Sequence, residues 1–127
     1  MVQLRIGGPQ ETDIDACGPD DLKKMHRALG AYLSVRNQVQ LTVKSIETEH
    51  TEDEYAIPFQ IFCGVSENIH NFWSLANARR IIGYTPEDNS QIRFADKIAK
   101  IKAVVLEAVE ADQAESFRDF CASRCGA

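Results

Sequence analysis

Residues 62–89 hold the strongest local pattern in the chain: the end of an apolar run, a polar loop, and an amphipathic segment with a stop signal. Residues 57–62 are rich in Ile and Phe, which is typical of a short buried strand, and Gly64 ends that run. Polar residues crowd the strand exit: Ser66, Glu67, Asn68, His70 and Asn71. Apolar residues then recur at helical spacing until Gly83 and Pro86 stop the segment. A strand that leads through polar residues into a helix predicts an α/β fold with a ligand-facing strand exit.

The first 35 residues repeat this strand-to-helix order. Residues 2–6 alternate in polarity and predict a strand. Gly18 and Pro19 suit the N-cap and first position of a helix, and the two aspartates that follow place negative charge where the helix dipole favours it. Because a strand, a helix and a second strand normally wind so that the strands are parallel, residues 2–6 and 57–63 are predicted to be parallel neighbours in one sheet.

The connection between these two parts is less regular. In residues 39–43 three aliphatic residues alternate with polar ones, so we predict a half-buried strand, and a helix tail is the alternative. Residues 47–54 are strongly acidic around His50, which is usual for a solvated loop. A cation site is the sharper alternative there, because hard cations need several converging carboxylates.

Residues 89–125 contain neither proline nor glycine and are predicted to form one long amphipathic helix. The apolar positions step by three and four: Phe94, Ile98, Ile101, Val105 and Val109. We expect the first four to be buried against the sheet or a second copy of the chain. A second apolar patch at Phe117, Phe120 and Cys121 has a different phase, so a break at residues 111–114 is an alternative. A stripe longer than the domain can cover is a candidate contact surface, which makes a homo-oligomer one expected partner.

Composition narrows the class of protein. At 127 residues, with 44% hydrophobic and 26% charged residues, the chain is predicted to be a single domain, residues 1–127. Its formal net charge of -5, with basic residues interleaved among acids, argues against nucleic acid. No apolar run approaches the roughly 20 residues of a membrane helix, and no signal-peptide pattern opens the sequence, so we expect no membrane partner and a cytoplasmic location. The four cysteines are interpreted as thiols, and no metal site is assigned.

Two parts of the chain carry motifs of a known enzyme family. The strand exit has a glycine-x-serine-x-asparagine pattern, a tryptophan follows, and a glycine-tyrosine-x-proline-x-aspartate-asparagine turn ends the next segment: Gly64, Ser66, Asn68, Trp73, Gly83, Tyr84, Pro86, Asp88 and Asn89. Residues 2–7, VQLRIG, are similar to that family's leucine-arginine-isoleucine-glycine strand, and residues 18–22, GPDDL, to the turn after it. Together these blocks resemble the C-terminal, substrate-side part of NAD-dependent uronate dehydrogenases. That family belongs to the extended short-chain dehydrogenase/reductases, of the NAD-dependent epimerase/dehydratase type.

The resemblance implies a partial Rossmann-type subdomain with short parallel strands, two or three helices and an added long C-terminal helix. Residues 1–30 and 56–89 are then family-like, residues 31–55 form an insertion-like loop or strand, and residues 90–127 form the C-terminal helix.

The resemblance also nominates a substrate site for a sugar acid. Arg5 corresponds to an arginine that faces the substrate carboxylate, which a guanidinium holds through paired hydrogen bonds. Ser66, Asn68 and Trp73 are the other candidate substrate-binding residues. Plainer structural roles remain open for each of them. Arg5 suits a solvated position, Ser66 and Asn68 suit caps of loop amides, and Trp73 suits a core anchor.

The catalytic and cofactor parts of that family have no counterpart in the sequence. No glycine-rich loop follows a strand, and no tyrosine has a lysine four positions on, because Tyr32, Tyr55 and Tyr84 are followed there by Arg36, Phe59 and Asp88. We therefore assign no catalytic and no cofactor-binding residue, and NAD is implied only by the family. The function predicted is a substrate-side fragment or subunit, inactive alone and completed by a separate cofactor-binding chain. The alternative is a non-enzymatic oligomerisation or protein-interaction module.

Overall fold

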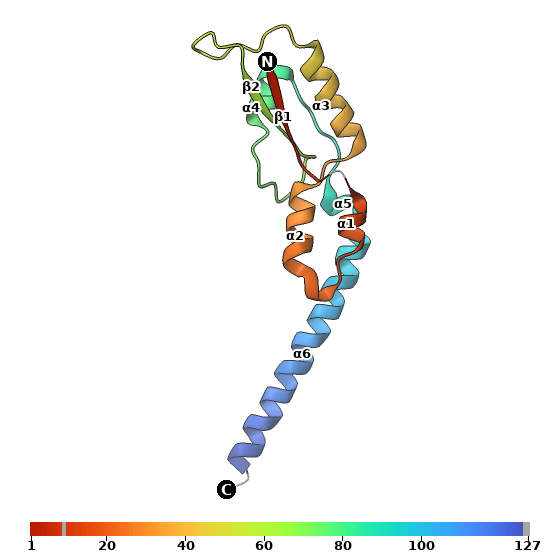
Figure 1. Cartoon of the computed structure of the whole chain (residues 1–127). Coiled ribbons are helices and arrows are strands. Elements are labelled where there is room, and N and C mark those ends of the chain that lie inside the picture. The colour runs from red at the N-terminus through yellow and green to blue at the C-terminus, as the bar shows by residue number, and fades with distance from the viewer. Residues whose placement is uncertain (9, 126–127) are drawn as a thin grey trace.

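The computed structural model describes residues 1–8 and 10–125 (Figure 1). In chain order the elements are β1 (Val2–Ile6), α1 (Glu11–Asp15), the 3₁₀ turn η1 (Pro19–Asp21), α2 (Leu22–Ala31), α3 (Val35–Glu47), β2 (Gln60–Gly64), α4 (Ala76–Ile82), α5 (Ser90–Arg93) and α6 (Ala95–Cys125). The sheet lies with α3 and α4 at one end of the molecule, α1, α2 and α5 occupy the middle, and α6 runs away from them (Figure 1). The fold is α/β, with more helices than the two or three expected.

The sheet consists of β1 and β2, which pair in parallel from Val2 opposite Gln60 to Ile6 opposite Gly64. This confirms the predicted pairing, although the second strand begins three residues later than Ile57. Side chains alternate across the sheet, so that one face carries Leu4 and its register partner Phe62, which is fully buried. The opposite face carries Gln3, Arg5 and Ile61, all exposed. The sheet is therefore covered on one face only.

Two hydrophobic clusters hold the fold together. The first joins the covered face of the sheet to α3 and α4, through Leu41, Phe62, Val65, Leu75, Ala78, Ile82 and Tyr84. The second joins α6 to α1 and α2, through Ile14, Cys17, Met25, Leu29, Tyr32, Phe94, Ile98 and Ile101. The prediction that α6 packs on the sheet is therefore wrong. The buried part of its apolar stripe, Ile98 and Ile101, lies in one cluster with residues of α1 and of the amphipathic helix α2 instead.

The strand predicted at residues 39–43 is wrong, because these residues lie in α3. Ser34 precedes that helix as its N-cap, and its hydroxyl accepts a hydrogen bond from the Asn37 amide at 3.2 Å. The alternation in sequence arose from two helix faces: Leu41 is fully buried, whereas Val39 and Val43 lie four residues apart on an exposed face. The insertion-like loop or strand assigned to residues 31–55 is thus mostly a helix. The acidic residues after it do form an exposed loop, as predicted.

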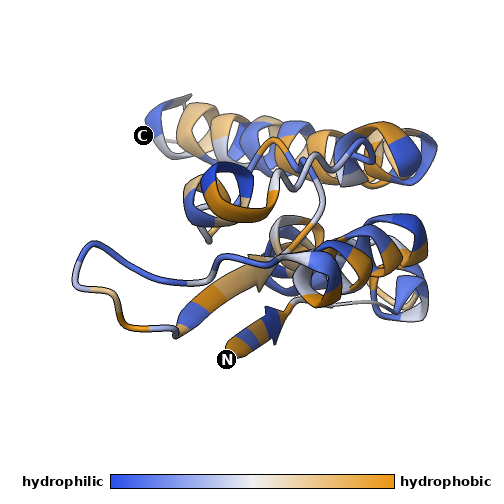
Figure 2. Ribbon diagram, turned by 90° about the horizontal axis from the view of Figure 1, so that it is seen from above, coloured by the Kyte–Doolittle hydropathy of each residue, from blue (hydrophilic) through white to orange (hydrophobic). Residues whose placement is uncertain are grey.

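The long helix is continuous through residues 111–114, so the alternative of a break there is wrong. Phe94, Ile98 and Ile101 are buried as predicted, and Val105 is partly buried. Every residue from Leu106 to Arg124 is exposed. Apolar positions nevertheless recur along the whole of α6 towards its C-terminal end (Figure 2). Within the described residues, none of the helices combines the length and the apolarity needed to cross a bilayer.

Truncation of the two aliphatic side chains at residues 101 and 104 tests what anchors α6. Ile101 is 6% exposed and Val104 is 49% exposed on the same helix. We expect Ile101→Ala to lower the free energy of unfolding by about 2–5 kcal/mol, because it leaves a cavity against α2. Val104→Ala should change it by only about 0.5 kcal/mol. Denaturant unfolding followed by circular dichroism measures both, and equal losses would show that α6 does not pack as described.

Candidate functional site

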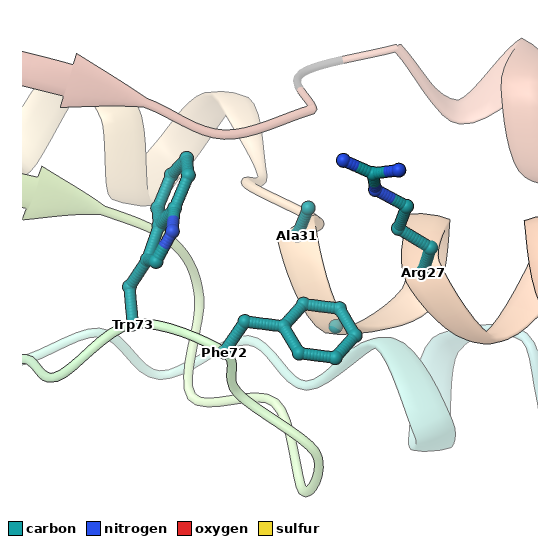
Figure 3. A pocket seen from close by; sticks show the side chains of 5 residues that line it. Arg27, Ala31, Phe72 and Trp73 are labelled. Carbon is teal, nitrogen blue, oxygen red and sulfur yellow. The ribbon is translucent and has the colours of Figure 1, made fainter.

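A cavity of about 350 Å³ lies between α2 and the loop that leaves β2 (Figure 3). It is lined by Arg27, Gly30, Ala31, Phe72 and Trp73. The Arg27 and Trp73 side chains stand at its two ends, and the Phe72 ring lies between them beneath Ala31 (Figure 3). One flexible cation and two aromatic walls therefore face a single space.

The loop reaches α2 closely because residue 30 is glycine. A Cβ added to Gly30 would lie 2.5 Å from the His70 carbonyl oxygen and 2.5 Å from the Phe72 ring. Those distances are shorter than any real Cβ contact, so no larger residue fits without a shift of the loop. The glycine that weakens the helix intrinsically is thus what allows the floor of the cavity to form.

Asn68 holds the same loop in place through buried hydrogen bonds. Its side-chain amide donates hydrogen bonds to the Tyr32 carbonyl at 2.9 Å and to the Gly30 carbonyl at 3.3 Å, and its amide oxygen accepts one from the Ser90 backbone N–H at 3.1 Å. Asn68 is only 5% exposed, so these bonds are made away from water. The residue ties the end of α2, the strand exit and the start of α5 to one another.

Ser66, two residues before Asn68, holds the loop in a similar way. Its hydroxyl oxygen accepts hydrogen bonds from the Ser34 backbone N–H and from the Asn37 side-chain amide, both at 2.9 Å, and the residue is fully buried. Ser66 and Asn68 therefore shape the loop that carries the aromatic walls, and neither lines the cavity. Of the residues named from sequence, only Trp73 lines it.

Arg5 lies elsewhere. It is exposed on the uncovered face of the sheet, opposite Cys63 in the β1–β2 register. Among the described residues its side chain finds no partner for a hydrogen bond or an ion pair, and it does not line the cavity. The arginine at the cavity is Arg27, which the sequence reasoning missed. Arg27 and Gly30 are three residues apart on a helix and therefore share one face, and this spacing was the sequence signal that could have identified Arg27.

Two histidines lie beside the cavity. The His26 and His70 rings have centroids 5.4 Å apart, and the His26 ring meets Phe72 edge-on at 5.8 Å. His26 comes from α2 and His70 from the loop, so the contact adds to the attachment of the loop to the helix. Both are exposed. They extend the aromatic surface around the mouth of the cavity.

Tyr32, at the end of α2, is held as a neutral phenol. Burial, and then its hydrogen bond to Glu11 at 3.0 Å, raise the pKa of Tyr32 to about 12. The pKa of Glu11 is lowered, chiefly by Arg93, whose Nε lies 2.7 Å from the same carboxylate oxygen. At neutral pH Tyr32 therefore stays protonated and donates to Glu11, which makes it a structural donor and a poor base.

Asp88 anchors the beginning of α3. Its carboxylate accepts a hydrogen bond from the Ser34 hydroxyl and one from Arg36 Nη2 at 2.7 Å. These two partners, the Ser34 hydrogen bond first, lower the pKa of Asp88. Asp88 belongs to the glycine-tyrosine-x-proline-x-aspartate-asparagine motif, so this part of the motif connects the turn after α4 to α3.

Metal ligands do not gather in the described part of the chain. No group of three or more His, Cys, Asp or Glu side chains among those residues is arranged to hold an ion, and the acidic loop after α3 belongs to no such group. Cys17, Cys63 and Cys121 are free thiols. The side chain of Cys125, the fourth cysteine interpreted as a thiol, lies outside the described residues. Comparison of the chain with family models, with characterised proteins and with solved structures found no match.

Adding a methyl group at each of two glycines tests whether residue 30 shapes the cavity. Alanine normally stabilises a helix over glycine by about 1 kcal/mol. We expect Gly30→Ala to lower the free energy of unfolding by about 1–3 kcal/mol instead, because the methyl group collides with the loop. Gly18→Ala is the control, since nothing lies within 4 Å of its added Cβ. Thermal unfolding separates the two, and a stabilised Gly30→Ala variant would contradict the close approach.

Acid titration tests the Asp88 anchor. Because the pKa of Asp88 is lower in the native state, its carboxylate stabilises the fold above the unfolded-state pKa. That contribution is lost as pH falls through the native pKa. We expect Asp88→Asn to be less stable than the wild type at neutral pH, and the two to converge below the ordinary aspartate range of about pH 4. Asp119→Asn, at an exposed site on α6, should match the wild type throughout. The measurement is the free energy of unfolding of each variant as a function of pH. If wild type and Asp88→Asn differ by the same amount at every pH, the carboxylate of Asp88 does not stabilise the fold in the way described.

Proposed function

We propose that this chain binds the sugar-acid substrate of an NAD-dependent oxidoreductase resembling uronate dehydrogenase, and that it is inactive by itself. The observation that carries the proposal is the cavity in which Arg27 faces Phe72 and Trp73. A guanidinium holds a carboxylate through two parallel hydrogen bonds, and aromatic faces cover the apolar side of a sugar ring. A space of about 350 Å³ lies within the range of small-ligand pockets.

The sequence resemblance is a second argument for assigning this cavity as a sugar-acid site. Trp73 belongs both to the family-like block and to the cavity wall. Ser66 and Asn68, from the glycine-x-serine-x-asparagine motif, hold the loop that places it there. In this proposal Arg27 takes the carboxylate-binding role that the sequence alone had given to Arg5. The fold is then a partial Rossmann-type, substrate-side subdomain.

Oxidation of a sugar acid requires NAD and a proton acceptor beside the reacting carbon. The sequence supplies neither the glycine-rich phosphate loop nor the Tyr-x-x-x-Lys pair. The proposal therefore places both on a separate chain that docks against the sheet. The uncovered sheet face with Gln3, Arg5 and Ile61 suits such docking, because parallel sheets are normally covered on both faces. In that complex Arg5 would lie at the docking surface.

Titration with a uronate tests the binding site directly. Nuclear magnetic resonance of the labelled chain should show shifts around residues 27–31 and 72–73 when galacturonate or glucuronate is added. We expect Arg27→Leu to weaken binding by about tenfold or more, since it removes a charge-assisted pair. Arg27→Lys should restore the charge but not the two parallel hydrogen bonds, and so bind less tightly than the wild type.

Arg5→Leu is the matched control for that titration, because it removes the same side chain from the sheet face and should leave uronate affinity unchanged. Equal loss in Arg5→Leu and Arg27→Leu would place the carboxylate elsewhere. A wild type that binds no uronate would overturn the pocket assignment. Turnover of NAD by the chain alone would overturn the claim that it needs a partner.

The second candidate function is a non-enzymatic interaction module on the same scaffold. The observation that favours it is the exposed length of α6 from Leu106 to Arg124. In this case uronates would not bind, and self-association would be the principal property of the chain.

A further inference from the structure

The fold brings together two of the chain's three histidines, which are far apart in the sequence. His26 lies on α2 and His70 lies in the loop that leaves β2, and their ring centroids are 5.4 Å apart. We call these two residues the histidine pair. Both are exposed, so an ion in solution can reach the rings. Imidazole nitrogen is a ligand that Zn²⁺, Cu²⁺ and Ni²⁺ favour, whereas Mg²⁺ and Ca²⁺ favour oxygen.

The elements that carry the histidine pair are packed against each other. His26 precedes Gly30 by four residues and so lies on the same face of α2. The loop runs close over that face, since a Cβ added to Gly30 would lie 2.5 Å from the His70 carbonyl oxygen. Phe72 continues the loop and meets the His26 ring edge-on at 5.8 Å. Because both elements are already in place, binding an ion between the two rings orders little more than the two side chains.

The distance between the two rings suits a shared ion. Zinc lies about 2.1 Å from an imidazole nitrogen and prefers tetrahedral angles, so two imidazoles on one zinc ion have their ring centroids about 5 Å apart. The 5.4 Å between the centroids of His26 and His70 is close to that value. Two protein ligands leave the other positions of a four-coordinate zinc ion to water.

We propose that His26 and His70 together bind one divalent transition-metal ion of the zinc type, through one ring nitrogen of each neutral imidazole. Water fills the remaining positions. The ion ties the loop that carries Phe72 and Trp73 to α2. The site requires neither a uronate nor a second chain, so metal binding and uronate binding can each fail without the other.

Unfolding of the untagged full chain with and without Zn²⁺ tests the site. Because the two histidines meet only in the folded chain, zinc at a hundred times its dissociation constant should raise the folded-to-unfolded ratio about a hundredfold. We expect His70→Phe to abolish this stabilisation, since it keeps an aromatic ring beside His26 and removes the nitrogen ligands. His26→Phe should abolish it too. Mg²⁺ should not stabilise the wild type, because it favours oxygen ligands.

His50→Phe is the matched control, because it makes the same change at an exposed histidine in the acidic loop after α3 and should keep the full stabilisation by zinc. Zinc stabilisation that survives His70→Phe, or that is lost in His50→Phe, places the ion on thiols or acidic residues and overturns the proposal. A wild type that zinc does not stabilise, or that Mg²⁺ stabilises equally, overturns it as well.

Nuclear magnetic resonance of the wild type gives a measurement that does not depend on how the variants fold. On addition of Zn²⁺ the ring nitrogen signals of His26 and His70 should shift together, at the same zinc concentration, while those of His50 stay in place. A shift of only one ring of the histidine pair, or of His50 first, would show that the two rings do not share an ion.

Discussion

The buried side-chain amide of Asn68 is the interaction on which the rest of the structure depends. It bonds two carbonyls at the end of α2 and the first amide of α5, and Ser90 in turn donates its hydroxyl hydrogen to the Leu29 carbonyl at 2.7 Å. All these groups are withdrawn from water, so an unmade bond would cost about 1–3 kcal/mol of desolvation for each group. Because each hydrophobic cluster lies on one side of this junction, Asn68 sets how the sheet half and the α6 half are joined.

That junction also explains why the cavity exists. The two clusters share no buried residue, and the cavity between α2 and the loop is lined by Gly30 and Ala31 of the helix and by the side chains of Arg27, Phe72 and Trp73. Gly30 lets the loop approach α2, and the hydrogen bonds of Asn68 hold the loop in that position. Phe72 and Trp73, which follow in the same loop, line the cavity as a consequence. The glycine-x-serine-x-asparagine motif therefore supports the candidate site by holding its loop, while neighbouring residues line the cavity.

The sequence was sufficient to predict a strand or a helix end wherever one physical signal dominated. The alternation of residues 2–6, the apolar run ending at Gly64 and the left-handed Gly83 after α4 each had one physical interpretation. It was insufficient at residues 39–43, because Val39, Leu41 and Val43 alternate as well in a helix that buries only the middle one. Arg27 was missed for a different reason. An exposed arginine on a helix gains meaning only when a distant loop closes over it, and that contact depends on the fold as a whole.

The arrangement of α2 keeps the cavity and α6 apart. Met25 and Leu29, four residues apart, form the face of α2 that is buried with Ile98 and Ile101 of α6. Arg27 follows Met25 by two residues and so lies about 200° around the helix, on the side turned away from α6. The amphipathic helix α2, ten residues long, thus packs against α6 with one face and presents the guanidinium of Arg27 to the candidate site on the other.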